Sequence, residues 1–494
     1  MTNDLDVLIV GAGISGLSAA WHLQQHRPGT SFALLEREAG YGGTWYTHRF
    51  PGIRSDSDLY TFGFHFKPWV GPPIATAAEI QKYLGEMIQE NNLGPHIRYN
   101  QAVETADWDS AAQRWRLGVR QADGSIAQMS CKFLWMAQGY YHHRKGYWPE
   151  WEGMASFKGT IAHTEEWDEA IDYTGKRVAL IGSGATAATV VPAMAQTAGH
   201  VTMVQRSPTW FFPAANVDET AEMLRPLDLP ADWVHEIVRR KKNYDQAEIT
   251  RRCREDTEAV KAELLGAVQA LLPEGYDMRH FTPSYDPWRQ RLAFVPDGDL
   301  FTGIREGKAS VVTGEIARFT PEGIAMADGT HVPADLVVLA TGFDLCVLGN
   351  ISFSRDGVAL DPADTVTYRG MMFTNMPNLV WVFGYFRASW TLRSDLVSQF
   401  VCRLLDHMDA TGATSVEPQL RAEDAGMALA PFFDLDDFNP HYIKRSLHLL
   451  PKSGPKPEWR HTQDYWTEKT ALPAIDLSGA EFAYTRPATA LAAE

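Results

Sequence analysis

The stretch Leu5-Asp-Val-Leu-Ile-Val10 followed by Gly11-Ala-Gly13-Ile-Ser-Gly16 decides the fold of this 494-residue chain. The apolar run predicts a buried parallel strand, the glycines predict a tight turn, and the pattern beyond them predicts a helix to about His26. A second apolar run at residues 31–35 ends at Glu36 and completes a βαβ unit. A helix N-terminus at such a turn attracts a pyrophosphate, and a carboxylate at Glu36 can accept hydrogen bonds from ribose hydroxyls. The unit therefore predicts a dinucleotide site, although a plain strand–helix turn would show the same glycines.

The same design recurs later in the chain. Residues 177–181 predict a strand, Gly182-Ser-Gly184-Ala-Thr-Ala187 the turn, and residues 200–204 the next strand. This strand ends in Gln205-Arg206-Ser207 instead of an acid, and an arginine can hold a 2′-phosphate that a carboxylate would repel. The first unit thus suits the ADP-ribose of FAD and the second suits NADP, unless Arg206 is only an exposed charge. Two such units predict a flavoprotein that a nicotinamide cofactor reduces.

The fold class predicted from these units is α/β, with two Rossmann-like dinucleotide-binding domains. Two further strands, at residues 133–136 and 336–339, run into small-residue turns that suit close approach of a ligand. Residues 214–284 are rich in Glu, Arg and Lys and predict a helical insertion, with residues 239–242 on a solvated helix face. A helix is expected near residues 396–408, and no regular structure in about the last 25 residues.

We accordingly expect five segments along the chain. Residues 1–141 form the first part of the FAD-binding domain, and residues 142–213 form the first part of the NADP-binding domain. The helical insertion follows at 214–284, and residues 285–347 return to the NADP-binding domain. Residues 348–494 complete the FAD-binding domain and form the C-terminal region.

Charge and cysteine content exclude several classes of protein. The chain has 45 basic and 61 acidic residues, a net charge of −16, which argues against nucleic acid or an anionic membrane surface as a partner. Its four cysteines are far apart in sequence, so we expect no metal site, no flavin disulfide reductase and a reducing compartment. The sequence starts without a signal-peptide pattern, and no stretch reaches about 18 uncharged apolar residues. We therefore expect a cytoplasmic protein without a transmembrane segment.

A segment just before the second unit carries a family resemblance. Phe157-Lys-Gly159-Thr-Ile-Ala-His163-Thr-Glu-Glu-Trp167-Asp168 resembles the fingerprint FxGxxxHxxxW(P/D) of type I Baeyer–Villiger monooxygenases, a group of class B flavoprotein monooxygenases. Related flavin monooxygenases that oxidise nitrogen and sulfur end this motif in Tyr or Phe and then Lys, so Trp167-Asp168 favours the Baeyer–Villiger branch. The resemblance implies that the motif lies on a linker between the domains and acts through domain motion. Direct proton transfer by His163 is the other interpretation.

Two more segments extend the resemblance. Gly42-Gly43-Thr44-Trp45 leads to Phe50-Pro51-Gly52 and Asp56, which in the family form a loop over the flavin and an active-site aspartate. The alternative for Asp56 is an aspartate that caps a turn. In Pro287-Trp-Arg289-Gln290-Arg291, Arg291 matches the family's active-site arginine, with Arg289 as the next candidate. Many members have a lysine before this arginine that helps to hold the NADP phosphate. Gln290 occupies this position in this chain, so binding of the NADP phosphate would depend more strongly on Arg206.

The resemblance is strongest to the ethionamide-activating monooxygenase subgroup, and it implies a function. The enzyme would use NADPH and O₂ to insert oxygen next to a ketone carbonyl through a C4a-peroxyflavin, giving esters or lactones. It would also oxidise sulfur in thioethers or thioamides. Arg291 would hold the charge of the peroxide anion, and Asp56 would orient Arg291. The alternatives are a flavin monooxygenase that acts mainly on nitrogen or sulfur, and a flavin-binding protein without turnover.

The expected site residues follow from these motifs and the resemblance. Trp390, Phe386 and Tyr60 are candidates for lining the substrate pocket, with ordinary packing as the alternative. The expected partners are a small ketone or organosulfur substrate and O₂. The residues expected to bind FAD or NADPH are Gly11, Gly13, Ser15, Gly16, Glu36, Gly43, Thr44, Trp45, Asp56, Val103, Gly182, Ser183, Gly184, Ala185, Thr186, Arg206, Ser207, Thr341 and Gly342.

Overall fold

The first βαβ unit folds as the sequence predicts. In the computed structural model, which describes residues 3–486, β1 (Asp4–Val10) lies parallel to β2 (Phe32–Leu35), and α1 (Ile14–His26) connects them. The apolar run of β1 at residues 7–10 is explained by burial on both faces of the sheet. Val7 and Ile9 pack into the hydrophobic cluster on one face, and Leu8 and Val10 pack into the cluster on the other.

The first sheet has nine strands, which come from distant parts of the chain. Their order is β20-β19-β4-β5-β6-β1-β2-β3, and β23 pairs with β6. The strands from residue 352 onward therefore return to a sheet that the N-terminal residues begin. The bounds of the added strands are β3 (Ile97–Arg98), β4 (Ala102–Asp109), β5 (Arg114–Arg120), β6 (Ile126–Met136), β19 (Ser352–Arg355), β20 (Val358–Leu360) and β23 (Leu379–Trp381).

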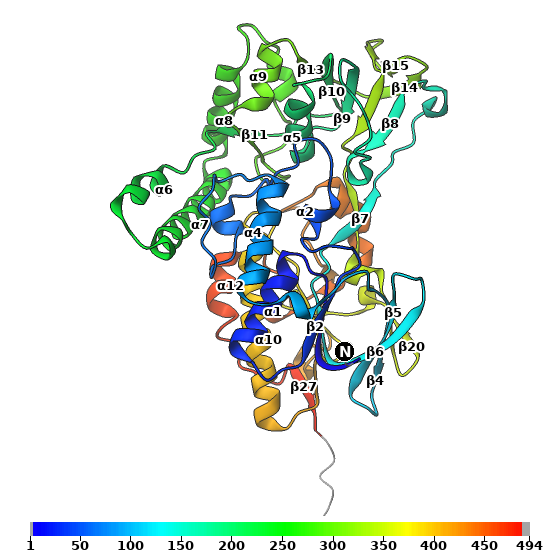
Figure 1. Cartoon of the computed structure of the whole chain (residues 1–494), viewed down its shortest axis with the longest axis vertical. Helices are drawn as coiled ribbons and strands as arrows, with labels where there is room; N and C mark the ends of the chain where they lie inside the picture. The colour runs from blue at the N-terminus through cyan, green and yellow to red at the C-terminus, as the bar shows by residue number, and fades with distance from the viewer. Residues whose placement is uncertain (1–2, 487–494) are drawn as a thin grey trace, which may run out of the picture.

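The second unit forms a separate parallel sheet, drawn above the first in Figure 1. Its strand order is β13-β10-β9-β17-β8, and α5 (Ala185–Met194) follows the second glycine turn. Both predicted dinucleotide units are thus present, which confirms the α/β fold class. The strands are β8 (Thr160–His163), β9 (Arg177–Ile181), β10 (His200–Gln205), β13 (Ala309–Thr313) and β17 (Leu336–Leu339).

A two-stranded ribbon joins the two units. It pairs β7 (Tyr141–Gly146) with β18 (Phe343–Leu345), the two places where the chain passes from one sheet to the other. The division of the chain at residues 141, 213, 284 and 347 stays our proposal.

The segment expected to be a helical insertion is helical and projects to one side in Figure 1. It contains α6 (Glu219–Leu224), α7 (Ala231–Glu255) and α8 (Thr257–Leu271). The expectation that residues 239–242 form a solvated face is wrong for Arg239. Its side chain is buried, and its Nη1 donates to the carbonyl oxygens of Tyr60, Thr61 and Gly63. Burial with full hydrogen bonding lets one cation of the run anchor the insertion to the first domain.

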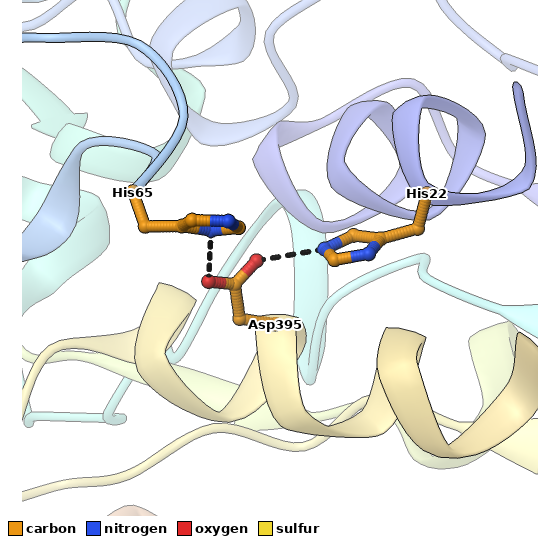
Figure 2. Close-up of side chains that lie close together, drawn as sticks. All are labelled: His22, His65 and Asp395. Atoms are coloured by element: carbon orange, nitrogen blue, oxygen red, sulfur yellow. Dashed lines mark hydrogen bonds and ion pairs between the residues drawn. The ribbon is translucent and has the colours of Figure 1, made fainter. Parts of the chain in front are cut away.

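Helix α10 (Trp390–Thr411) packs against α1 and begins earlier than the sequence predicts. Figure 2 shows one contact that ties this pair together, where Asp395 lies between His22 and His65. Asp395 Oδ1 is 2.9 Å from His22 Nε2, and Asp395 Oδ2 pairs with His65 Nδ1. Burial would raise the pKa of Asp395, but the two imidazoles outweigh it and hold that pKa below its usual value. The carboxylate of Asp395, which belongs to α10, therefore links this helix to α1 and to the loop after α3 (Leu59–Phe62).

The C-terminal region includes α11 (His441–Ser446), α12 (Tyr465–Ala471), and β27 (Phe482–Thr485), which pairs with β24 (Ser415–Pro418). The expectation of no regular structure in about the last 25 residues is wrong for β27. Residues 487–494 of that stretch lie outside the described residues. None of the described helices is long and apolar enough to cross a membrane. The remaining longer elements are α2 (Thr44–Thr47), α4 (Ala77–Glu90), α9 (Asp299–Arg305), β11 (Phe211–Ala214), β12 (Ala293–Pro296), β14 (Ile316–Thr320), β15 (Gly323–Met326) and β16 (His331–Pro333).

Candidate functional site

A cavity of about 430 Å³ lies between the first glycine turn, the loop that carries Asp56, and the segment that carries Arg291. It brings together many of the predicted site residues from distant parts of the chain. Those that line it are Gly11, Gly13, Ser15, Glu36, Gly43, Thr44, Trp45, Asp56, Val103, Ala185, Thr186 and Arg291.

The first glycine turn has the shape that a close backbone approach requires. Gly11 has a φ of +102°, and a Cβ there would lie 2.8 Å from the carbonyl oxygen of Ala137. Glu36 is buried and accepts backbone hydrogen bonds from Ala12 and Glu38, at 2.8 and 2.9 Å. These bonds fix its carboxylate at the carboxyl edge of the sheet, where a ribose would lie.

The Gly-Gly-Thr-Trp segment packs directly on this turn. Gly42 donates its amide hydrogen to the carbonyl of Ala12 at 2.9 Å, and Gly43 has a φ of +57°. A Cβ on Gly43 would lie 3.2 Å from Cα of Gly13, so the positive φ and the close approach both favour glycine at position 43. The loop predicted to cover the flavin therefore lies against the predicted FAD turn, and both segments line the cavity.

Arg291 and Asp56 form an ion pair at the cavity wall. Arg291 Nη1 lies 2.8 Å from Asp56 Oδ2, and the two side chains are 40% and 34% exposed. Asp56 thus pairs with the arginine, as the family resemblance implied, and does not cap a turn. Arg289, the other candidate, is exposed and does not line the cavity. The catalytic roles of Arg291 and Asp56 stay predictions.

The surroundings keep the Arg291 guanidinium charged. Burial alone would lower its pKa, but the carboxylate of Asp56 outweighs burial and raises that pKa above its usual value. Burial raises the pKa of Tyr140 to about 12, so this phenol stays neutral at physiological pH. The pair therefore offers a permanent cation and one carboxylate to a bound molecule, and the neighbouring tyrosines add neutral hydroxyl groups.

Aromatic rings surround this ion pair. Tyr140 stacks on Trp390 with ring centroids 5.0 Å apart, and both line the cavity with Phe343 and Phe386. Tyr442 lies behind them, 4.9 Å from the ring of Phe343. Of the three aromatic candidates from the sequence, Phe386 and Trp390 line the cavity, whereas ordinary packing holds for Tyr60, which is buried away from it and donates to the carbonyl oxygen of Gly71.

Sequence reasoning missed Tyr140, Phe343 and Tyr442. Tyr140 directly follows Gly139, which ends the small-residue turn after residues 133–136, so its position gave a usable signal. Phe343 similarly follows the Ala-Thr-Gly turn. Tyr442 had no such signal, because its place depends on how the C-terminal region folds back.

The second glycine turn lies apart from most of the cavity. Ser183 Oγ donates to the carbonyl oxygen of Ser207 at 3.0 Å, which places the end of β10 beside this turn. Arg206 is exposed, and its Nη2 lies 2.7 Å from His441 Nε2. The predicted cofactor residues outside the cavity lining are Gly16, Gly182, Ser183, Gly184, Arg206, Ser207, Thr341 and Gly342.

The fingerprint histidine is held in place by hydrogen bonds on both ring nitrogens. His163 Nδ1 accepts from the amide of Glu165 at 3.0 Å, so Nε2 donates to Thr341 Oγ1 at 3.2 Å. Burial lowers the pKa of His163. A Cβ on Gly146 would lie 2.0 Å from this ring, so the ribbon packs tightly on it. This neutral, fully occupied imidazole favours the linker interpretation over proton transfer.

The other fingerprint residues also make structural contacts. Phe157 packs on Phe319 with ring centroids 6.2 Å apart, and a Cβ on Gly159 would lie 2.3 Å from the carbonyl oxygen of Asp335. Trp167 packs near Tyr173, and Asp168 accepts a hydrogen bond from the amide of Ala170. These contacts hold the motif around β8, an edge strand of the second sheet, and leave none of the four in the cavity wall, so the linker role stays a prediction.

A buried side-chain contact connects the fingerprint to the loop predicted to cover the flavin. His48 Nε2 lies 3.0 Å from Glu165 Oε2, with only 8% and 5% of the two side chains exposed. Tyr141 OH lies 3.3 Å from the same nitrogen and 2.5 Å from Thr44 Oγ1. Sequence reasoning missed this pair, because His48 and Glu165 are 117 positions apart.

Metal ligands were not expected from the sequence. His22, His65 and Asp395 are the described residues whose ligand atoms lie within 4.8 Å of one another. Their direct hydrogen bonds account for this geometry without an ion (Figure 2).

Comparisons with known proteins agree with this site. A model described as "NAD(P)-binding Rossmann-like domain" matches residues 9–69, and one described as "Flavin-binding monooxygenase-like" matches residues 66–223. The FAD-containing monooxygenase EthA of Mycolicibacterium smegmatis is 45% identical over 469 residues, 94% of each chain.

Solved structures share the fold over nearly the full length. A crystal structure of OTEMO with FAD and NADP has a TM-score of 0.77 at 22% identity, covering 97% of this chain and 99% of that one. Cyclohexanone monooxygenase with bound ε-caprolactone has a TM-score of 0.75 at 18% identity, covering 98% and 100%. FAD and NADP, the cofactors predicted from the sequence, are both bound in the OTEMO structure, and EthA is named as FAD-containing. The resemblance drawn from the motifs is confirmed, and the chain belongs to the family of FAD-containing monooxygenases that includes EthA.

Proposed function

We propose that this protein binds FAD and NADPH and is a Baeyer–Villiger monooxygenase, which converts ketones and O₂ into esters or lactones. We also propose that it oxidises the sulfur of thioethers or thioamides in the same cavity. For a ketone, one oxygen atom of O₂ enters the product, and the other leaves as water with two electrons from NADPH. The flavin, when bound, supplies the transfer of those electrons to O₂.

The Arg291–Asp56 pair is the observation that carries the proposal. Oxygen insertion next to a carbonyl needs a fixed cation beside an oxygen that develops negative charge. Arg291 provides it, because its neighbours keep the guanidinium charged. Asp56 holds that guanidinium from one side at 2.8 Å and leaves its other N–H groups free to donate.

The cavity walls support the choice of substrate. Tyr140, Phe343, Phe386 and Trp390 give an apolar, ring-lined space beside Arg291. Such walls suit an uncharged organic molecule and exclude water from the reacting atoms. The hydroxyl of Tyr140 can donate to a carbonyl oxygen because its pKa is raised to about 12.

The cofactor assignment follows the two glycine turns. Glu36 and the turn at residues 11–16 suit FAD, and Arg206 beside the turn at residues 182–187 suits the 2′-phosphate of NADPH. The Trp167-Asp168 ending of the fingerprint supports this branch over enzymes acting mainly on nitrogen or sulfur. The four buried, unpaired cysteines support a cytoplasmic location.

The test begins with the absorbance spectrum of the purified protein, which should show bound flavin. A panel of cyclic and linear ketones and a thioether is then incubated with NADPH and O₂, and esters, lactones and sulfoxides are quantified by mass spectrometry. Ester or lactone formation supports the proposal. Sulfoxide without any ester from the whole panel would instead establish an oxidase of sulfur, and absence of flavin after reconstitution with FAD would refute both.

A further inference from the structure

We propose that His441 binds the 2′-phosphate of NADPH together with Arg206 and thereby strengthens the preference for NADPH over NADH. This rests on the proposed function, because it assumes that NADPH binds at the second glycine turn. His441 begins α11, more than 230 positions from Arg206, yet the two side chains meet with Nη2 and Nε2 2.7 Å apart.

The contact joins two groups that both favour an anion. Arg206 is a permanent cation that only donates hydrogen bonds, so His441 Nε2 must be the acceptor and the ring is neutral. The pKa of His441 is lowered mainly by partial burial and further by the positive charges of Arg206, Lys444 and Arg445. A neutral imidazole is therefore kept beside cations that would stabilise a nearby phosphate.

Two of these three cations, Arg206 and Lys444, have no carboxylate partner among the described residues of a strongly acidic protein. The chain carries a net charge of −16, yet within residues 3–486 neither Arg206 nor Lys444 forms an ion pair with a carboxylate. Arg445 does, with Asp344 at 3.3 Å. An uncompensated basic group on such a surface is suited to a phosphate ligand.

The position of His441 also fits the cofactor site. Ser183 Oγ binds the carbonyl oxygen of Ser207, so Arg206 lies next to the turn where the pyrophosphate is expected. Asn439, two residues before His441, donates its amide hydrogen to the carbonyl of Arg289 at 3.0 Å. The segment with His441 thus runs beside Gln290, an uncharged residue where the family resemblance led us to expect a lysine. His441 supplies a second basic group from another part of the chain.

Binding of the phosphate would change the protonation of His441. A dianion within hydrogen-bond distance favours the imidazolium over the imidazole, so the pKa of His441 rises on binding. The groups that face it are Arg206 from the end of β10, and Lys444 and Arg445 from α11. NADP⁺ binding should therefore take up protons at neutral pH, and affinity should fall as the pH rises.

The test measures dissociation constants of the FAD-loaded enzyme for NADP⁺, NAD⁺ and 2′,5′-ADP by isothermal titration calorimetry. His441→Ala should weaken NADP⁺ and 2′,5′-ADP by roughly 10-fold, the effect of one charge-assisted hydrogen bond, and leave NAD⁺ within about 2-fold. His448→Ala, at an exposed histidine on the same segment, is the matched control and should change neither. Flavin absorbance and the thermal midpoint verify that each variant is folded.

Proton uptake separates a ligand from a merely structural residue. Titrations in buffers of different ionisation enthalpy give the protons taken up per NADP⁺, including those of the phosphate itself, whose pKa is about 6. His441→Gln should reduce this number relative to the parent enzyme. Unchanged NADP⁺ affinity in His441→Ala, or equal weakening of NADP⁺ and NAD⁺, would overturn the inference. Parent enzyme that does not distinguish NADP⁺ from NAD⁺ would instead refute the NADPH assignment itself.

Discussion

Replacement of Arg291 by alanine tests whether this chain oxygenates substrates or only oxidises NADPH. The variant should keep its flavin, because the residues around the first glycine turn do not depend on Arg291. NADPH should still be consumed. Ester formation should fall by at least about 10²-fold, and the electrons should appear as H₂O₂ instead.

The magnitude follows from the geometry of the pair. Deleting one stabiliser of a developing oxyanion costs about 2.7–4 kcal/mol, or roughly 10²- to 10³-fold in rate. Arg291 is 40% exposed within the open cavity, and Asp56 at 2.8 Å offsets part of its charge. Both features weaken the field at a reacting oxygen, so we expect the lower end of that range.

The assay measures ester produced per NADPH consumed, with H₂O₂ quantified in the same sample. Arg289→Ala is the matched control, since Arg289 lies two residues away but is exposed outside the cavity. Arg291→Lys should rescue only part of the yield, because an ammonium cannot present a planar fork. Ester yield near that of the parent in Arg291→Ala would refute the role of this arginine, and a loss confined to Arg289→Ala would reassign it.

Three further predictions concern the cofactor turn and the buried ionisable groups. Glu36→Gln should weaken FAD binding by roughly 10- to 150-fold, measured by flavin fluorescence after dialysis, because it removes a charged acceptor for ribose hydroxyls. Glu165→Gln should cost about 1–3 kcal/mol, because it removes the buried carboxylate whose Oε2 lies 3.0 Å from His48 Nε2, and the double variant with His48→Gln should cost less; a thermal midpoint equal to that of the exposed control Glu169→Gln would contradict this. Burial lowers the pKa of His235 from 6.5 to about 4. Between these pH values only the unfolded chain binds a proton, so the free energy of unfolding should decrease as the pH falls below about 6.5, by up to about 3 kcal/mol. His235→Gln should show a smaller loss of thermal midpoint between pH 7 and pH 5 than the parent, and equal losses would count against the assignment.

The elements that could be predicted from sequence are those whose pattern is local. Strand β1 is buried on both faces, so its apolar run at residues 7–10 is continuous, and the glycine turn after it is marked by residues that must approach other backbone closely. Helix α10 was predicted too short because its first residues lack such a local pattern. Its first turn contains Thr391, Arg393 and Ser394, which are polar yet buried, so no apolar period marks it.

Arg239 shows why charge patterns alone can mislead. It stands in a run of four basic residues, of which Arg240 and Lys241 make exposed pairs with acids one turn away. Arg239 instead turns inward because three carbonyl oxygens of another segment are available to it. No feature of the local sequence distinguishes it from its neighbours, since the acceptors are about 180 positions away in the chain.

The candidate site likewise has a part that local sequence predicts, the cofactor turns, and a part that it does not, the substrate pocket. A dinucleotide needs particular backbone shapes and charges at its phosphates and riboses, and these needs leave signals within about 30 residues of sequence, as at residues 11–36 and 182–206. A substrate pocket needs only apolar rings at the right place, and the chain has many of those. Tyr442 and Tyr60 are both tyrosines with apolar surroundings, yet Tyr442 packs against Phe343 of the cavity wall whereas Tyr60 packs under the helical insertion. Their difference arises from how residues 348–486 fold back over the first sheet, which is a property of the whole chain.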